Sequence, residues 1–154
     1  MIDADPPQCH GLVYIAGEME YGSTDFTAMQ WRVIGDGDVG GVVEMVAEFP
    51  SATKADEFVD TQAQAWEGCV DEVITSTYKE DGSTTQDRVT AVHARPGIVI
   101  ASTEGASVES SCRHGRHVLQ AVSNVVLEVS ACADTDSRQA EAIASKLAER
   151  VQSG

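Results

Sequence analysis

The sequence has little positive charge and few aromatic residues, and it lacks any long apolar run. Lysine and arginine total 10 against 25 acidic residues, which gives a net charge of −15, and aromatic residues make up 5% of the chain. A surface of this charge repels phosphate backbones and anionic lipid headgroups, so we expect no nucleic-acid partner and no direct membrane binding. No apolar run approaches the ~20 residues of a transmembrane helix. The same charge favours a soluble monomer.

The amino-terminal end has none of the features of a secretion signal. Residues 1–7, MIDADPP, are acidic and turn-like, whereas a signal peptide begins with basic residues followed by an apolar stretch. If the protein is exported, its targeting segment lies outside this sequence. The length of 154 residues fits a single domain over 1–154, to which a segment preceding residue 1 could also belong.

The four cysteines include no Cys-x-x-Cys pair, so zinc ribbons and thioredoxin-type redox sites are not indicated. They are Cys9, Cys69, Cys112 and Cys132. An even number fits two disulfides in an exported protein, and three pairings are then possible. Four reduced, buried cysteines in a cytosolic protein are the competing interpretation.

A predicted hairpin near the carboxyl end favours one of these pairings. Residues 113–120 and 124–131 are typical of strands, and 121–123 would connect them. In an antiparallel hairpin with that centre, Cys112 lies opposite Cys132, close enough to bond. Cys9 and Cys69 then form the second pair.

Hydrophobic periodicity predicts an α+β fold. The predicted strands are 27–34, 41–49, 71–78, 87–94, 97–103, 113–120 and 124–131, and the predicted main helices are about 51–68 and 137–151. Ser51 is a suitable N-cap, and apolar residues from Ala52 to Trp66 recur at helical spacing. Because successive strands are joined by short turns, we expect an antiparallel sheet of about five to seven strands packed with the two helices.

Five segments resemble the PknH-like extracellular domain family. They are 112–117 (CRHGRH), 123–132 (SNVVLEVSAC), 139–151 (QAEAIASKLAERV), 66–69 (WEGC) and 49–52 (FPSA). Members are mycobacterial and related actinobacterial sensor domains, found as the outer part of a transmembrane Ser/Thr kinase or as free-standing cell-envelope lipoproteins. The resemblance implies two disulfides, an antiparallel sheet with helices and a ligand-holding cleft, without a catalytic residue. Members usually carry a further segment before the first cysteine, and their strand after Cys112 is less rich in histidine.

Two apparent motifs have simpler structural explanations. Residues 35–40, GDGDVG, satisfy the spacing of a dinucleotide-binding loop, but a predicted strand follows them instead of a helix. An EF-hand calcium loop would need a ligand at Gly40 and a glutamate at Ala47, so we interpret the segment as a hairpin turn. Ser51-Ala-Thr-Lys54 matches S-x-x-K of penicillin-binding enzymes, whose other two elements are missing, and an N-cap serine explains it.

The candidate binding residues are Arg113, His114, Arg116 and His117, the one concentrated basic stretch in the sequence. They are a possible anion or partner contact, and the competing interpretation is an edge strand protected by its charges. A metal site of Cys112, His114 and His117 is disfavoured, because residue 117 points to the opposite face of the strand and a bonded Cys112 cannot coordinate. We expect no metal, no cofactor and no catalytic residue.

The sequence therefore predicts an extracytoplasmic, non-catalytic sensor domain of the cell envelope that binds a small molecule or an envelope protein. The alternative is an envelope hydrolase or transferase with an unrecognised active site. A serine or cysteine nucleophile within bonding reach of His93 or His117 would favour that alternative.

Overall fold

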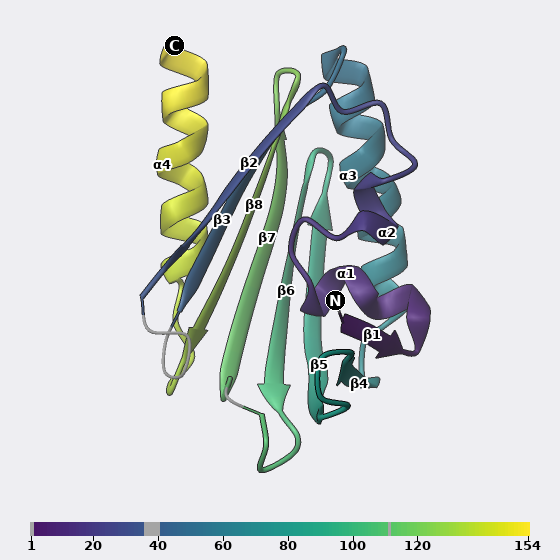
Figure 1. The fold of residues 1–154 in the computed structure, drawn as a ribbon. Helices are drawn as coiled ribbons and strands as arrows, with labels where there is room; N and C mark the ends of the chain where they lie inside the picture. Colours follow the sequence, from purple (N-terminus) through teal and green to yellow (C-terminus); the bar gives the residue numbers. More distant parts are fainter. Residues whose placement is uncertain (1, 36–40, 111) are drawn as a thin grey trace.

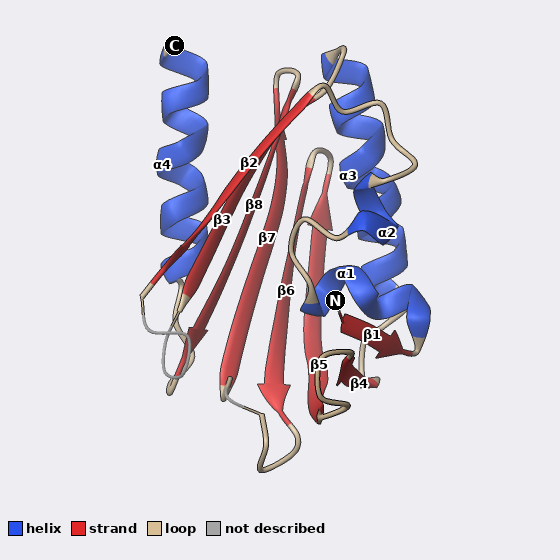
Figure 2. Cartoon of the chain, in the orientation of Figure 1, coloured by secondary structure: helices blue, strands red, loops and turns tan. Residues whose placement is uncertain are grey.

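The chain folds into one antiparallel sheet with helices on both faces (Figures 1 and 2). The structure, a computed structural model, describes residues 2–35, 41–110 and 112–154. The strands are β1 (Ile2–Asp5), β2 (Ala28–Ile34), β3 (Val42–Glu48), β4 (Val73–Tyr78), β5 (Thr84–Arg95), β6 (Ile98–Gly105), β7 (His114–Val122) and β8 (Val125–Ala133). Their order in the sheet is β1-β4-β5-β6-β7-β8-β3-β2. The α+β class is confirmed, with eight strands instead of the predicted five to seven.

The two long helices, α3 (Ala52–Glu67) and α4 (Gln139–Ser153), lie on opposite faces of this sheet. Successive side chains of a strand alternate between faces. Leu119 of β7 accordingly packs in the cluster that contains the buried side chains of α3, whereas its neighbour Val118 packs with Ala140 and Ala144 of α4. Each helix therefore has its own apolar cluster, and the sheet separates the two.

Helix α3 begins and ends where the sequence indicates. The Ser51 hydroxyl accepts a hydrogen bond from the Lys54 backbone N–H at 3.2 Å, which confirms the predicted N-cap. Ala55, Phe58 and Trp66 are buried on the face that meets the sheet. The S-x-x-K spacing is thus explained by helix capping.

Residues 2–26 form structure that periodicity does not indicate. Strand β1 pairs with β4 at one edge of the sheet, and a 3-10 turn (Pro7–Cys9), α1 (His10–Val13) and α2 (Glu18–Tyr21) follow. Each of these elements has at most four residues, which is too short for a periodic pattern. The Cys9–Cys69 disulfide, with Cα atoms 5.9 Å apart, ties this segment to the end of α3.

Both predicted disulfides are present, but the hairpin register used to predict one of them is wrong. Cys112 and Cys132 are bonded, with Cα atoms 5.3 Å apart. In the β7–β8 ladder, however, Gly115 lies opposite Cys132, because the hairpin turns at Ser123 and Asn124, between the paired Val122 and Val125. Cys112 lies before β7 begins. A Cβ atom on Gly115 would clash with Thr103 Oγ1 of β6 and would make only an ordinary contact with the Cys112 sulfur, so the glycine mainly leaves space for Thr103.

The turn predicted for residues 35–40 falls mostly on residues 36–40, which lie outside the described residues. No helix in the described part of the chain is both long enough and apolar enough to cross a membrane.

Candidate functional site

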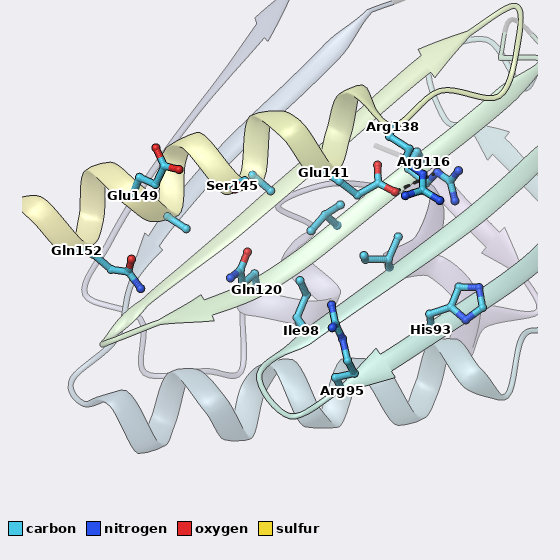
Figure 3. Close-up of a pocket in the computed structure, with 14 residues that line it drawn as sticks. His93, Arg95, Ile98, Arg116, Gln120, Arg138, Glu141, Ser145, Glu149 and Gln152 are labelled. Carbon is cyan, nitrogen blue, oxygen red and sulfur yellow. Dashed lines mark ion pairs between the residues drawn. The ribbon is translucent and has the colours of Figure 1, made fainter.

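A groove runs between α4 and the strands β5, β6 and β7 (Figure 3). It forms because α4 packs on β7 and β8, near one side of its face of the sheet. The groove has a volume of about 680 Å³, within the usual range for small-molecule sites. The lining residues are His93, Arg95, Ile98, Ile100, Arg116, Val118, Gln120, Arg138, Glu141, Ala144, Ser145, Ala148, Glu149 and Gln152.

The groove combines an apolar floor with small residues on its helical wall. Ile98, Ile100 and Val118 come from alternate positions of β6 and β7, which all face α4. Ala144 and Ala148 lie on the buried side of the helix, one turn apart. Their short side chains leave space between helix and strands, so an apolar group has room to enter.

Two arginines and one histidine border this floor, and their side chains make no internal polar contact among the described residues. His93 and Arg95 lie on the strand side, and Arg138 lies at the start of α4 (Figure 3). All three are exposed, and none makes a hydrogen bond or ion pair to another residue in the part of the chain that the structure describes. In a chain of net charge −15, the two unpaired arginines are available for an anionic partner.

Arg116 lies near Arg138 at one end of the groove (Figure 3), but its guanidinium is already hydrogen-bonded and ion-paired to other residues. It donates to Ser102 Oγ at 2.7 Å and to Asp136 Oδ1 at 2.7 Å, and its Nε is 3.4 Å from Glu141 Oε1. These contacts fix the connection from β8 to α4. Arg116 therefore positions the helix that forms the groove wall.

Glu141 leaves one oxygen without a partner. Its Oε1 faces Arg116, whereas its Oε2 is buried and accepts no hydrogen bond from any described residue. A buried carboxylate oxygen normally has a donor. The groove therefore offers a position for a hydroxyl or amine of a bound molecule, or for a water.

The structure separates the four residues of the predicted basic patch. Arg116 lines the groove, and His114 lines an adjoining hollow of about 310 Å³ that also includes His93 and Arg116. Arg113 is exposed and lines neither space. His117 points to the other face of the sheet, as the alternation of strand positions predicts, and is 3% exposed.

His117 belongs to a buried polar network beneath α1 and α2. Its Nε2 is 2.8 Å from Glu128 Oε1, and its Nδ1 is 3.2 Å from the Leu12 carbonyl oxygen. Tyr21 donates to the other Glu128 oxygen at 2.8 Å. Burial, reinforced by the Glu128 charge, raises the pKa of Tyr21 well above its usual value, so the phenol stays protonated and donating. The network fastens the amino-terminal segment to β7 and β8.

The described residues give no support to the hydrolase or transferase alternative. The two nitrogens of His117 face a carbonyl and a carboxylate, and His93 has no hydrogen-bond partner among the described residues. No cluster of three or more His, Cys, Asp or Glu side chains suited to a metal occurs in ranges 2–35, 41–110 and 112–154. All four cysteines are bonded in disulfides.

Arg95, Arg138 and Glu141 were not identified from the sequence. Arg95 and Arg138 are far apart in the chain, and Glu141 is one of many acidic residues. The predicted strand 87–94 ends one residue before Arg95, whereas β5 continues through it, so Arg95 shares a face with His93, two residues earlier.

Comparison with known proteins places the chain among extracellular sensor domains. Residues 1–150 match the PknH-like extracellular domain. The serine/threonine-protein kinases PknH of Mycobacterium bovis and Mycobacterium tuberculosis are each 30% identical over 94% of this chain, which spans about a quarter of their length (24% and 23%). The crystal structure of the extracellular domain of PknH from Mycobacterium tuberculosis superposes with a TM-score of 0.90 at 27% identity, covering 100% of this chain and 79% of that one.

Proposed function

Because the chain belongs to the PknH-like extracellular domain family, we propose that it is a ligand-binding sensor module whose binding site is the groove beside α4. The domain is extracytoplasmic: its relatives' matching part is an extracellular domain, and two disulfides persist in oxidising compartments. Its relatives' matching part is also separate from a kinase catalytic domain, which suggests a non-catalytic role.

One observation carries the proposal: the free cations of the groove in an otherwise acidic protein. Arg95 and Arg138 stand on opposite walls of a space that is floored by isoleucine and valine. An unpaired arginine beside an apolar surface is suited to a ligand that has both an anionic group and a hydrocarbon part. The free oxygen of Glu141 adds an acceptor for a hydroxyl of the same ligand.

We therefore propose an amphiphilic anion of the cell envelope as the ligand class. Its phosphate or carboxylate would contact Arg95 or Arg138, and its apolar part would cover Ile98 and Ile100. His114 and Arg116, both named from the sequence, would border this site in the adjoining hollow.

Calorimetric titration with decyl phosphate tests the proposal, with decyl maltoside as a neutral comparison and inorganic phosphate as the head group alone. We expect decyl phosphate to bind most tightly. The double variant Arg95→Ala/Arg138→Ala should bind it at least ~10-fold more weakly, since a charge-assisted hydrogen bond contributes about 1.5–3 kcal/mol.

Lys146→Ala is the matched control, because Lys146 is an exposed cation of α4 outside the groove lining. It removes one positive charge from the same helix, where the double variant removes two from the groove, and it should leave the affinity unchanged. Equal binding of decyl maltoside, or equal losses in the Lys146 and double-arginine variants, would refute the groove as an anion site.

A further inference from the structure

The two edges of the sheet are protected very differently. Strand β1 has four residues and carries Asp3 and Asp5, and charges on a short strand are a common protection against edge-to-edge pairing. Strand β2 has seven residues, AMQWRVI, with one charged side chain, Arg32. That charge is already paired, since Arg32 Nε donates to Glu44 Oε2 at 2.6 Å. The β2 edge is therefore longer than the β1 edge and carries fewer charges.

The β2 edge is also apolar and open to solvent. Trp31 is 64% exposed, Val33 55% and Ile34 43%. Within the described ranges, β2 pairs with β3 and no strand lies on its other side. Its outward backbone N–H and C=O groups are therefore available to a further strand.

We propose that β2 is a self-association edge, along which two copies of the chain pair antiparallel about a two-fold axis. The proposal is independent of the function of the groove. A two-fold axis perpendicular to the sheet places the same face of both copies on the same side. Residues directly opposite each other must then belong to the same face, so the axis must lie at a residue of β2 that pairs with its own copy and cannot lie between two residues. A register centred on Trp31 is the one that pairs all seven residues of β2.

The sequence of β2 is self-complementary in this register. On the α3 face, Trp31 meets Trp31 of the second copy, and Met29 meets Val33. On the α4 face, Gln30 lies opposite Arg32, and Ala28 lies opposite Ile34. Aromatic and apolar pairs of this kind stabilise neighbouring strands. A register centred on Arg32 would instead place two guanidinium groups directly opposite each other, which is destabilising.

The absence of acidic residues from β2 permits a second copy at this strand, and the net charge of the chain makes the association depend on salt. The β2 strand contains no acidic residue, although the chain carries a net charge of −15. The contact strands therefore do not repel each other, while the remaining surfaces do. We expect a monomer at low ionic strength, as the net charge predicts, and a dimer once added salt screens the long-range repulsion.

Sedimentation velocity tests the proposal at protein concentrations from about 10 µM to about 1 mM, in about 0.05 M and 0.5 M NaCl. The expected result is a monomer–dimer equilibrium that shifts at least ~5-fold toward dimer in the higher salt. The chain has two tryptophans, of which Trp66 is 1% exposed. Dimer formation should therefore appear as protection of Trp31 from acrylamide quenching.

Trp31→Lys and Val33→Lys should each weaken dimerisation at least ~10-fold, because both place a charge on the apolar row of the edge. Val108→Lys is the matched control, since Val108 is 97% exposed and lies in the turn after β6. Unchanged melting temperatures show that the variants remain folded, and two edge variants keep the test valid if one does not. A wild-type chain that is monomeric at the highest concentration and salt overturns the proposal, as does a dimer that neither edge variant weakens. If the wild-type chain stays monomeric, the β2 edge would instead be available to pair with an extended segment of another protein.

Discussion

Among single residues, Glu128 makes the strongest demand on its surroundings, because it carries a carboxylate and the residue is only 3% exposed. A buried carboxylate is tolerated when charged or hydrogen-bonding groups surround it. Here His117 faces one oxygen and Tyr21 donates to the other, while the Ala16 backbone N–H approaches the second oxygen at 3.4 Å. Two of these donors belong to the amino-terminal segment, so the hydrogen bonds of the buried Glu128 carboxylate are complete only when that segment is folded.

Tyr21→Phe should lower the free energy of unfolding by about 1–3 kcal/mol, since it removes one donor and leaves the ring packed on Phe58. Because burial raises the pKa of Tyr21, the folded state holds its proton more tightly than the unfolded state does. The wild type should therefore lose stability above pH 10.0, and the variant should lack this loss. Urea denaturation from neutral to alkaline pH measures both effects.

Tyr14→Phe is the control for this variant. Tyr14 is half-buried and stacks on His10, and its hydroxyl has no hydrogen-bond partner among the described residues. Removing that hydroxyl should change the stability by less than ~0.5 kcal/mol. Equal losses in the two variants would mean that the Tyr21 bond to Glu128 contributes nothing.

At the scale of single residues, alternation along a strand was a reliable guide to the face of the sheet on which a side chain lies. It assigned His114 and His117 to opposite faces, and the structure confirms this. It did not indicate what covers each face. His117 became buried because α1, which is too short to be predicted, and Trp66 of α3 lie against it. Arg138 joined the groove because of where α4 packs, a property that depends on tertiary contacts.

At the scale of elements, the two disulfides stabilise different parts of the fold and differ in loop length. Cys9–Cys69 spans 60 residues and Cys112–Cys132 spans 20. In the chain-entropy treatment these loops correspond to about 4 and about 3 kcal/mol. Cys9 and Cys69 are also fully buried, so their removal leaves space in the core.

Cys9→Ala/Cys69→Ala should therefore destabilise the chain more than Cys112→Ala/Cys132→Ala does, as measured by urea denaturation. Hydrogen exchange should locate the two effects. The first variant should expose the backbone of β1 and α1, whereas the second should expose the start of β7. An equal or reversed order of stabilities would contradict the loop-length argument.

The predicted element boundaries were accurate where a long periodic pattern met a capping or turn residue, as at Ser51 and α3. The β7–β8 hairpin shows where such reasoning fails. Its disulfide was paired correctly, but the predicted strand register differs from the observed one. The turn was placed at 121–123, whereas it lies at Ser123 and Asn124. Cys112 reaches Cys132 from outside the strand, above Gly115. The pattern of hydrophobic residues does not encode that path.

At the scale of the whole molecule, stability depends on the repulsion among the surface members of the 25 acidic residues. Some acids are paired, such as Glu44 with Arg32, but helix α3 also exposes Asp60 and Glu67, which have no ion-pair partner among the described residues. Repulsion among such charges disfavours the compact state and is screened by salt, since the Debye length falls from about 30 Å at 0.01 M salt to about 10 Å at 0.1 M.

The melting temperature should accordingly rise between these two salt concentrations. Asp60→Asn/Glu67→Gln should raise it at low salt and reduce its salt dependence, whereas Lys146→Gln, which makes the net charge more negative, should lower it. Scanning calorimetry of the three proteins measures this, and a melting temperature that falls as salt is added would mean that the ion pairs, which salt weakens, outweigh the repulsion among the acids.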